Sequence, residues 1–529
     1  MKKVFALLLT LSLLLGAVSA LAQDAYAPFP ITEEDVSITM GRYTYLGRFE
    51  NIGEMWKWKD YAEKTGVAVT FKEYPETGWQ EIIQLELATG NLQDAYYQIG
   101  FSDNQMFEQT QAGNFIALDE LIEAHAPNIK KMFEDHPSFR KALEMPDGKV
   151  YSLPFIERDV LTASARSYIS VALLAETGLP VPATMDEMTA YLRKVKELHP
   201  DMAPLAMNGS MEMVVQLYQG AYGLGNRGLK GVQSYIDLGE DGKVRFIPTA
   251  PGYKAMMQQL AAWYAEGLIN PESLSTIDVP RMRNLASEGQ LGLFVWVMPS
   301  LATPNFSEYE QWIGITALEG PEGHRMMNWL DAPVRNPYSF VITKKNQHPV
   351  ETIKWVDYFY SEEGYLYQKF GVEGVTYAQG EDGFYGFIGE AAEKQQENML
   401  SYVLGNHGSG FPLHNNAPEW SDKAKKIAFD VSTRATDAER YRTPTEEDYM
   451  ALVPEELWPT FAATPEEAED LSVILSDMKP YILEAQDKFI TGALNFEADW
   501  DTYVNNLNRM GAEQYVDIRQ AQYERYSQE

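Results

Sequence analysis

The order of apolar patterns between residues 36 and 101 restricts the fold more than any other feature of the chain. Alternate residues from Val36 to Met40 are apolar, which is the period of a half-buried strand, whereas Trp58 and Ala62 lie one helical turn apart. The patterns predict, in order, a strand at 36–45, a helix at 55–66, a strand at 67–71, a helix at 79–88 and a strand at 94–101. This order implies a parallel sheet with right-handed crossovers.

A second region with α/β patterning follows, and the last third of the chain is mainly helical. Continuous apolar runs at 291–297 and 338–343 predict buried strands, and a capping box at 184–187 opens a helix. Thr-Pro-x-Glu motifs at 443–446 and 464–467 place a cap and then a proline at helix starts. Because a chain of 529 residues is too long for one ordinary domain, we predict two α/β lobes with a helical C-terminal region.

The first 22 residues have the composition of a secretory signal peptide. Lys2 and Lys3 precede an apolar run at 4–18, and the A-L-A sequence at 20–22 fits a cleavage site. The alternative is an uncleaved anchor, but the run is shorter than the roughly 20 residues that a membrane span needs. We therefore expect an extracytoplasmic protein, cleaved near Ala22, with no cysteine there to carry a lipid anchor.

Several kinds of chemistry are excluded or disfavoured by the sequence. The chain has no cysteine, which excludes disulfides, thiol catalysis, and zinc or iron–sulfur sites bound by cysteine. Residues 223–228 match the G-x-G-x-x-G dinucleotide fingerprint, but a helical pattern at 211–218 precedes them where the motif requires a strand. We predict a structural loop there. His407 and His414 lack metal-ligand spacing, so we predict no cofactor, no metal ion and no catalytic residue.

Charge and aromatic content indicate the kind of partner. Lys and Arg number 43 against 76 Asp and Glu, and the resulting net charge of −33 repels nucleic acids and anionic membranes. The 31 Tyr, 23 Phe and 11 Trp residues are mostly core, but a minority could line a cleft. Flat rings stack on the C–H faces of sugars, and polar side chains bind the hydroxyls, which fits the usual composition of a ligand pocket.

Six segments, in order along the chain, resemble the family-one extracellular solute-binding proteins, and most closely their larger exported subgroup. The segments are 147–154 (DGKVYSLP), 178–187 (GLPVPATMDE), 263–271 (WYAEGLINP), 354–364 (KWVDYFYSEEG), 371–377 (GVEGVTY) and 489–492 (FITG), the last followed by Trp500 and Met510-Gly511. The chain departs from the family pattern at 167–174, which lacks the usual Arg, Asp and Trp. It departs again at 197–204, where many relatives carry a calcium-type loop.

The resemblance implies a two-lobed periplasmic-binding-protein-like fold of type II. Each lobe is expected to be a mostly parallel sheet flanked by helices, with the ligand bound between the lobes as they close. The implied divisions are a signal peptide at 1–22, lobe 1 at 23–158 and 331–383, and lobe 2 with the C-terminal helices at 159–330 and 384–529.

Ligand-binding residues of open α/β sheets are expected on loops at the carboxyl ends of strands. Any one of the aromatic candidates could instead be a core residue, because buried rings are the norm. Trp296 and Tyr377 are the preferred pair. The full set of candidates is Tyr45, Tyr97, Arg158, Trp296, Trp329, Asn336, Tyr377, Phe411 and Trp420.

Three functions remain open at this point. The first is a monomeric, non-catalytic protein that captures an oligosaccharide and passes it to the permease subunits of an ABC importer, as the resemblance implies. The second is a secreted glycan-processing enzyme, which would need a carboxylate pair in the cleft. The third is a binding protein for a peptide or a sugar acid. It would need a basic cleft, for which Arg42 and Arg48 are candidates.

Overall fold

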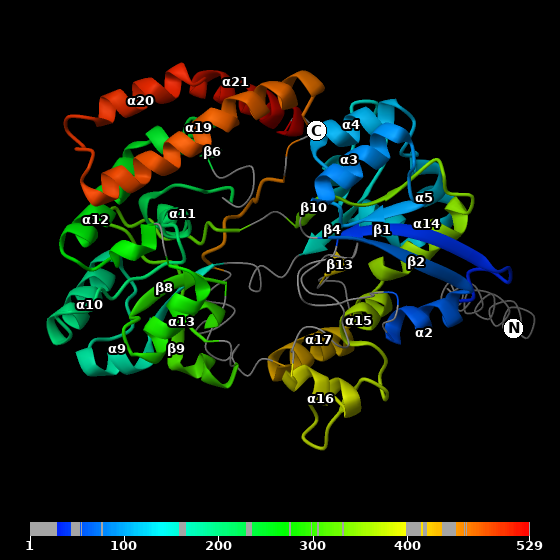
Figure 1. Cartoon of the computed structure of the whole chain (residues 1–529), viewed down its shortest axis with the longest axis horizontal. Coiled ribbons are helices and arrows are strands. Elements are labelled where there is room, and N and C mark those ends of the chain that lie inside the picture. The colour runs from blue at the N-terminus through cyan, green and yellow to red at the C-terminus, as the bar shows by residue number, and fades with distance from the viewer. Residues whose placement is uncertain are drawn as a thin grey trace, which may run out of the picture.

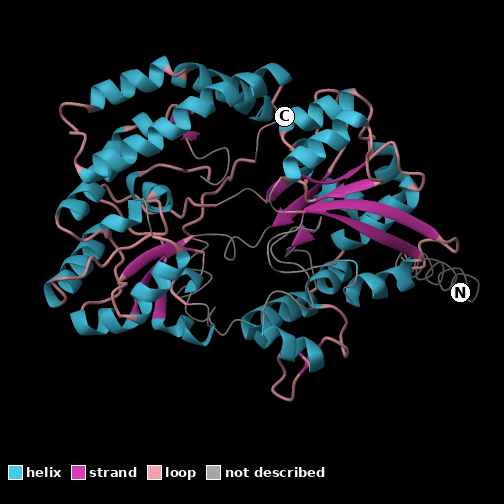
Figure 2. Ribbon diagram, viewed as in Figure 1, coloured by secondary structure: helices cyan, strands magenta, loops and turns pink. Residues whose placement is uncertain are grey.

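Two α/β lobes lie side by side in the computed structural model of the chain, with the C-terminal helices along one edge (Figure 1 and Figure 2). This confirms the two-lobed α/β fold expected from the sequence. The predicted signal peptide lies outside the described residues. The structure describes residues 29–43, 53, 56–75, 78–157, 165–228, 235–274, 277–297, 299–303, 306–330, 333–397, 414–415, 421–435, 451–459, 461 and 463–527.

Lobe 1 contains a six-stranded sheet in the order β13-β4-β10-β3-β1-β2. β1 pairs in parallel with β2 and β3, as predicted. The third strand is shorter than the predicted 94–101, because Gln98 (φ 56°) and Gly100 (φ 69°) turn the chain. The strands are β1 (Val36–Tyr43), β2 (Val67–Tyr74), β3 (Ala95–Tyr97), β4 (Leu153–Glu157), β10 (Val334–Ile342) and β13 (His414–Asn415).

The strand β10 reaches lobe 1 only after the chain has passed through lobe 2. It runs antiparallel to both of its neighbours, with Phe340 opposite Tyr97 of β3 and Leu153 of β4. The register against β4 shifts on both sides of Asn336. Such irregularities bend a strand and re-aim its side chains.

Helices cover both faces of this sheet. Successive side chains of a strand point to opposite faces. Tyr97 therefore joins the core that contains Trp58 and Trp355, whereas Tyr96 joins a second cluster with Tyr74. The helices are α2 (Trp56–Thr65), α3 (Trp79–Thr89), α4 (Asp103–Gln111), α5 (Asp119–His125), α6 (Pro127–Asp135), α7 (Pro137–Lys141), α14 (Pro349–Asp357), α15 (Glu362–Phe370), α16 (Gly389–Glu397) and α17 (Asp422–Ala435), with a hairpin of β11 (Tyr377–Gln379) and β12 (Tyr385–Phe387).

The sheet of lobe 2, like that of lobe 1, contains one strand that runs antiparallel to both of its neighbours. This sheet has the order β8-β5-β9, formed by β8 (Leu293–Trp296), β5 (Arg166–Ser170) and β9 (Trp312–Ile315). β5 is antiparallel to both neighbours, so β8 and β9 run in the same direction. Leu205 forms parallel bridges with Leu293 and Ile269. Both pairings within this three-stranded sheet are therefore antiparallel, because β5 is the reversed strand, and the parallel neighbours in lobe 2 are the bridges of Leu205.

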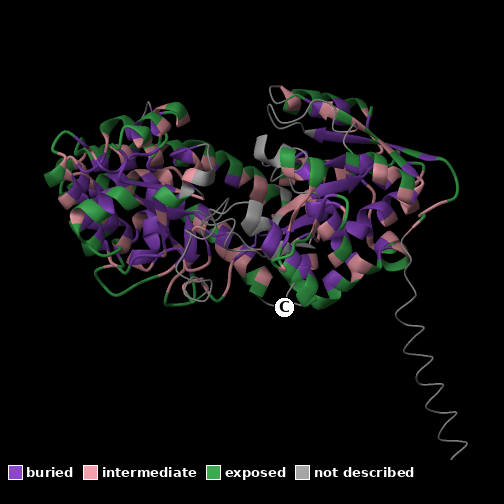
Figure 3. Ribbon diagram, turned by 90° about the horizontal axis from the view of Figure 1, so that it is seen from below, coloured by how far each residue is buried: buried purple, intermediate pink, exposed green. Residues whose placement is uncertain are grey.

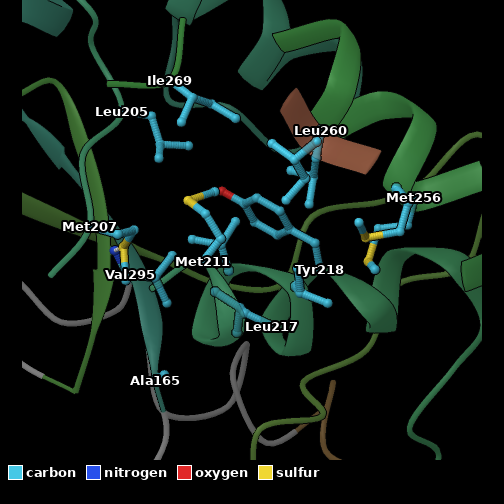
Figure 4. Packing of buried hydrophobic residues seen from close by; sticks show 14 of the residues in the cluster. Ala165, Leu205, Met207, Met211, Leu217, Tyr218, Met256, Leu260, Ile269 and Val295 are labelled. Atoms are coloured by element: carbon cyan, nitrogen blue, oxygen red, sulfur yellow. Dashed lines mark hydrogen bonds between the residues drawn. The ribbon is translucent and has the colours of Figure 1, made fainter. Parts of the chain in front are cut away.

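Each lobe has its own hydrophobic core, seen as separate buried regions in Figure 3. In lobe 2 the buried Tyr218 packs among Met211 and Leu260 (Figure 4), and its hydroxyl lies 3.0 Å from Ser167 Oγ of β5. The elements of lobe 2 are α9 (Val171–Thr177), α10 (Met185–Leu198), α11 (Glu212–Tyr218), β6 (Ile236–Leu238), β7 (Val244–Phe246), α12 (Pro251–Ala265), α13 (Val279–Ser287), α19 (Pro465–Thr491), α20 (Trp500–Arg509) and α21 (Ala512–Ser527). Among the described helices, none has both the length and the apolar character needed to cross a membrane.

The assignment of residues 384–529 to lobe 2 is wrong in its first part. Ala424 and Ile427 of α17 are buried in the core of lobe 1, and the Asp430 carboxylate accepts a hydrogen bond of 2.9 Å from the backbone N–H of Tyr385. The helix α19, in contrast, buries Met478 and Ile482 in the core of lobe 2. Apolar periodicity identifies a helix but not the lobe that covers its apolar face, which explains the error.

The glycine-rich segment at 223–228 is a structural loop, as predicted. It follows the helix α11 and a 3₁₀ turn rather than a strand. The fully buried Asp237 accepts the Gly225 N–H at 2.7 Å and two bonds from Arg245, at 2.8 and 2.6 Å. Arg245 also donates to the Gly223 carbonyl at 2.8 Å, so one ion pair fixes the loop.

The substitution Asp237→Asn should lower the free energy of unfolding by about 2 kcal/mol, because it leaves Arg245 without its carboxylate. Calorimetric unfolding measures the loss. Asp477→Asn, at an exposed position of α19, is the matched control and should change stability by less than about 0.5 kcal/mol. Equal losses in the two variants would contradict the assigned role of the Asp237–Arg245 pair.

Candidate functional site

Trp296 is the last residue of β8 and lies where the chain enters lobe 2. In the sheet it is directly opposite Arg166, the first residue of β5. β5 is the first strand of lobe 2 after β4 of lobe 1, so this end of the sheet faces the crossing between the lobes. Trp296 is partly exposed and packs against the lobe 2 core with the rest of its surface. A ring that is anchored on one side and accessible on the other can act as a stacking surface.

Trp329 lies on the segment that leads from β9 back to β10. Its indole N–H donates to Gln216 Oε1 at 2.9 Å, and the Asn328 side-chain amide donates to the Gln216 carbonyl at 2.7 Å. Gln216 belongs to α11, which is built into the lobe 2 core. The partly exposed Trp329 ring therefore has its orientation fixed by the core.

Asn336 lies within β10 itself, opposite Phe155 of β4. Its side-chain oxygen accepts the Tyr338 N–H at 3.1 Å, and its side chain is partly exposed. Trp329 and Asn336 thus lie on the return from lobe 2 to lobe 1, and Trp296 lies at the end of the lobe 2 sheet where the chain enters that lobe. In open α/β folds this side of the sheets is where ligands bind.

The prediction that Tyr97 faces the cleft is wrong. Its ring is 1% exposed and belongs to the lobe 1 core, with the Arg42 guanidinium 5.0 Å from its centroid. Burial raises the pKa of the Tyr97 hydroxyl. The ring lies at the carboxyl end of its strand, as the rule requires, but it points to the face that α2 and α15 cover.

The same end of the sheet holds a group of basic side chains. Lys57 of α2 is buried beside Arg42, and its ammonium donates to Gln368 Oε1 at 3.2 Å. Burial lowers the pKa of Lys57 well below its usual range, and the charges of Arg42 and Lys369 act in the same direction. Arg42 is thus part of the interior of lobe 1, while Arg48, the other candidate for holding an anion, lies outside the described residues.

The prediction that Tyr377 faces the cleft is also wrong. Its ring is 4% exposed and packs between Phe370 and Tyr385, at 6.3 Å from each ring centroid. Burial, reinforced by the charge of Glu373, raises the pKa of Tyr377 to about 12. It lines a cavity of 360 Å³ whose walls come from α2, α15, α17 and the loop after α15, all in lobe 1.

The remaining candidates, Tyr45, Arg158, Phe411 and Trp420, lie outside the described residues. Two further residues near Trp296 and Trp329 were not predicted from the sequence. Arg166 is 1% exposed and lies opposite Trp296 in the sheet, and a charged residue shortly before Tyr168 and Ile169 of the buried strand β5 was the available signal. Gln216 holds Trp329 across 113 positions of sequence, which no local pattern could indicate.

Tyr377→Ala should therefore lower stability without changing ligand affinity. Removing a buried ring of this size costs about 3 kcal/mol of unfolding free energy. Thermal unfolding measures the first effect, and titration with a bound ligand measures the second. A tenfold loss of affinity together with an unchanged melting temperature would show that the ring contacts ligand after all.

Comparison with known proteins identifies the family. The family model described as bacterial extracellular solute-binding protein matches residues 52–365, which is more than half of the chain. The fructooligosaccharide ABC transporter substrate-binding protein FusA of Streptococcus pneumoniae serotype 4 is 23% identical over 495 residues, covering 88% of this chain and 86% of FusA.

Solved structures give the same fold. FusA in complex with kestose superimposes with a TM-score of 0.71 at 21% identity, covering 93% of this chain and 99% of FusA. The alginate-binding protein AlgQ2 without calcium ion gives 0.67 at 22% identity, covering 93% and 99%. An HMO-binding solute-binding protein from Bifidobacterium longum infantis gives 0.74 at 18% identity, covering 94% and 100%. With its two lobes and the reversed strand in each sheet, the chain belongs to the bacterial extracellular solute-binding proteins.

Proposed function

We propose that this protein captures an oligosaccharide between its two lobes, outside the cytoplasm, and delivers it to the permease subunits of an ABC importer without changing it. The observation that carries the proposal is the pair of partly exposed, anchored tryptophans, Trp296 and Trp329, beside the crossing segments. The name of FusA, a fructooligosaccharide ABC transporter substrate-binding protein, supports the ligand class and the partner.

Two kinds of protein group bind a sugar, aromatic rings and hydrogen-bonding side chains. A sugar offers apolar C–H faces for ring stacking and hydroxyls for hydrogen bonds, and Trp296, Trp329 and Asn336 supply both kinds of group. Because Gln216 already fixes the Trp329 ring, binding costs little side-chain entropy at that position. A ligand that contacts both lobes favours their closed arrangement, since those contacts exist only there.

The proposal also covers residues outside the described part of the chain. Arg158 follows β4 directly, and the segment with Phe411 and Trp420 surrounds β13, which pairs with β4 at the sheet edge. The described ends of β13 and β4, Asn415 and Glu157, pair where the chain leaves lobe 1. We propose that these residues and Tyr45 complete the binding site, and that the signal peptide is removed near Ala22 so that a monomeric protein acts at the cell envelope.

The first test is a thermal-shift screen of residues 23–529 against neutral and acidic oligosaccharides, followed by product analysis of every hit. Relatives named for fructooligosaccharide and for alginate justify both classes of glycan. A ligand at 100 times its Kd should stabilise the protein by about 2.7 kcal/mol. Intact glycan after incubation is the expected result, whereas shortened glycan would replace the proposal with a secreted glycan-processing enzyme.

Trp296→Ala should weaken binding of the identified glycan about tenfold, because it removes a stacking surface worth about 1–1.5 kcal/mol. Isothermal titration calorimetry measures the change. Trp500→Ala is the control, because this buried tryptophan packs in the C-terminal helices of lobe 2. It should lower the melting temperature and leave Kd unchanged. An unaltered Kd in Trp296→Ala would remove this ring from the site.

A further inference from the structure

The C-terminal helices form an arm that is built on lobe 2. Met478 and Ile482 of α19 and Tyr515 of α21 are fully buried in the lobe 2 core. The ring of Tyr515 meets Phe246 of β7, with their centroids 5.9 Å apart. The arm runs along the edge of lobe 2 and extends beyond it to the helix α4 of lobe 1 (Figure 1).

The far end of this arm is attached to lobe 1. Lys141 of α7 donates to the carbonyl of Tyr526 at 2.5 Å and to that of Arg525 at 3.4 Å, and its ammonium lies 5.1 Å from the Tyr526 ring centroid. These carbonyls end the helix α21, where a cation is electrostatically favoured. Arg525 binds both carboxylate oxygens of Glu467, at 2.8 and 2.6 Å, which ties the end of α21 to the start of α19.

A second contact between arm and lobe lies beside α4. A cavity of 20 Å³, about the space of one water molecule, has walls from both parts of the protein. Lobe 1 contributes Asp103, Phe107 and Met145, and the arm contributes Thr464 and Ala468. Met106 of α4 and the arm residue Leu471 belong to separate hydrophobic clusters. The two surfaces therefore touch without sharing a continuous core.

The same contact is linked to the crossing strand β10. The Tyr338 hydroxyl of β10 donates to Asp103 at 2.9 Å. Burial raises the pKa of Asp103, while the Tyr338 hydrogen bond and the charge of the buried Arg519 of α21 act in the opposite direction. The arm thus meets lobe 1 at a side chain that is held by the strand connecting the lobes.

We propose that the C-terminal arm is a brace that limits the range of angles between the lobes and so sets the affinity of the cleft. This inference rests on the proposed capture of a ligand between the lobes. If only the crossing segments joined the lobes, one lobe could rotate relative to the other. A ligand that touches both lobes would then have to remove this rotational freedom when it binds. A brace that has already removed part of this freedom lowers the entropic cost of binding. Releasing it should therefore weaken binding.

Because the chain has no cysteine of its own, spin labels attach only to cysteines that are introduced. Leu85→Cys in α3 and Leu198→Cys in α10 are exposed positions, 65% and 42%, on lobe 1 and lobe 2, and they accept a pair of spin labels. Distances between the labels are measured with and without the glycan. The brace variant is Lys141→Ala with Asp103→Asn. The control is Lys130→Ala with Asp135→Asn, which breaks the ion pairs Lys130–Glu123 and Lys131–Asp135, both within lobe 1.

We expect the brace variant to show a broader distance distribution without glycan and a Kd for glycan raised about fivefold or more. The control variant should match the parent protein in both measurements. An unchanged distribution, or a Kd that is equal or lower, would overturn the inference. Lys141→Gln, which keeps the aliphatic stem, repeats the test should the double variant fold poorly. If no glycan binds the parent protein, the proposed function fails, but the distance distribution still decides whether the arm restrains the lobes.

Discussion

The place of β10 in the sheet of lobe 1 is the constraint on which the rest of the structure depends. Its residue Phe340 lies between Tyr97 of β3 and Leu153 of β4, so the two halves of that sheet meet only through it. Because β10 comes after the whole of lobe 2 up to β9, the sheet of lobe 1 closes only when the chain has returned. The return segment is therefore fixed at both ends, which places Trp329 and Asn336 beside the crossing.

The reversed strand of lobe 2 obeys the same rule. β5 is antiparallel to β8 and β9, and it is the first strand after the chain leaves lobe 1. In each lobe the strand that runs against the others is the one that arrives from the other lobe. The chain consequently enters lobe 2 at the end of its sheet where Arg166 and Trp296 lie opposite each other. Ligand sites of open α/β sheets form at such topological switch points.

Local patterns in the sequence were sufficient for the elements from β1 to β3 and for the strands β8 and β10, but not for β5, β9 or the identity of the site. The alternation from β1 to β3 was predicted because strand and helix periods are properties of neighbouring residues. Tyr97 was misplaced because a position at the carboxyl end of a strand does not say which face of a sheet a ring occupies. Tyr377, the first residue of β11, was misplaced because the turn before it does not indicate that its ring packs between Phe370 and Tyr385. The lobe that receives α17 depends on contacts of Ala424 and Ile427 with distant residues, and the sequence contains no period that encodes them.

Of the two tryptophan rings in the candidate site, that of Trp329 is positioned by the core rather than by its own loop. Trp329 is held by Gln216 of α11, and Tyr218 of the same helix is packed in the core with its hydroxyl on Ser167 of β5. This series of contacts leaves the ring little freedom to adjust to a ligand. Shape adjustment at Trp329 must then come from a change in the angle between the lobes rather than from its ring. The hydrogen bonds of Lys141 to the C-terminal arm, and the charge of Arg519 near Asp103, act on that angle, so affinity is expected to depend on residues that never touch the ligand.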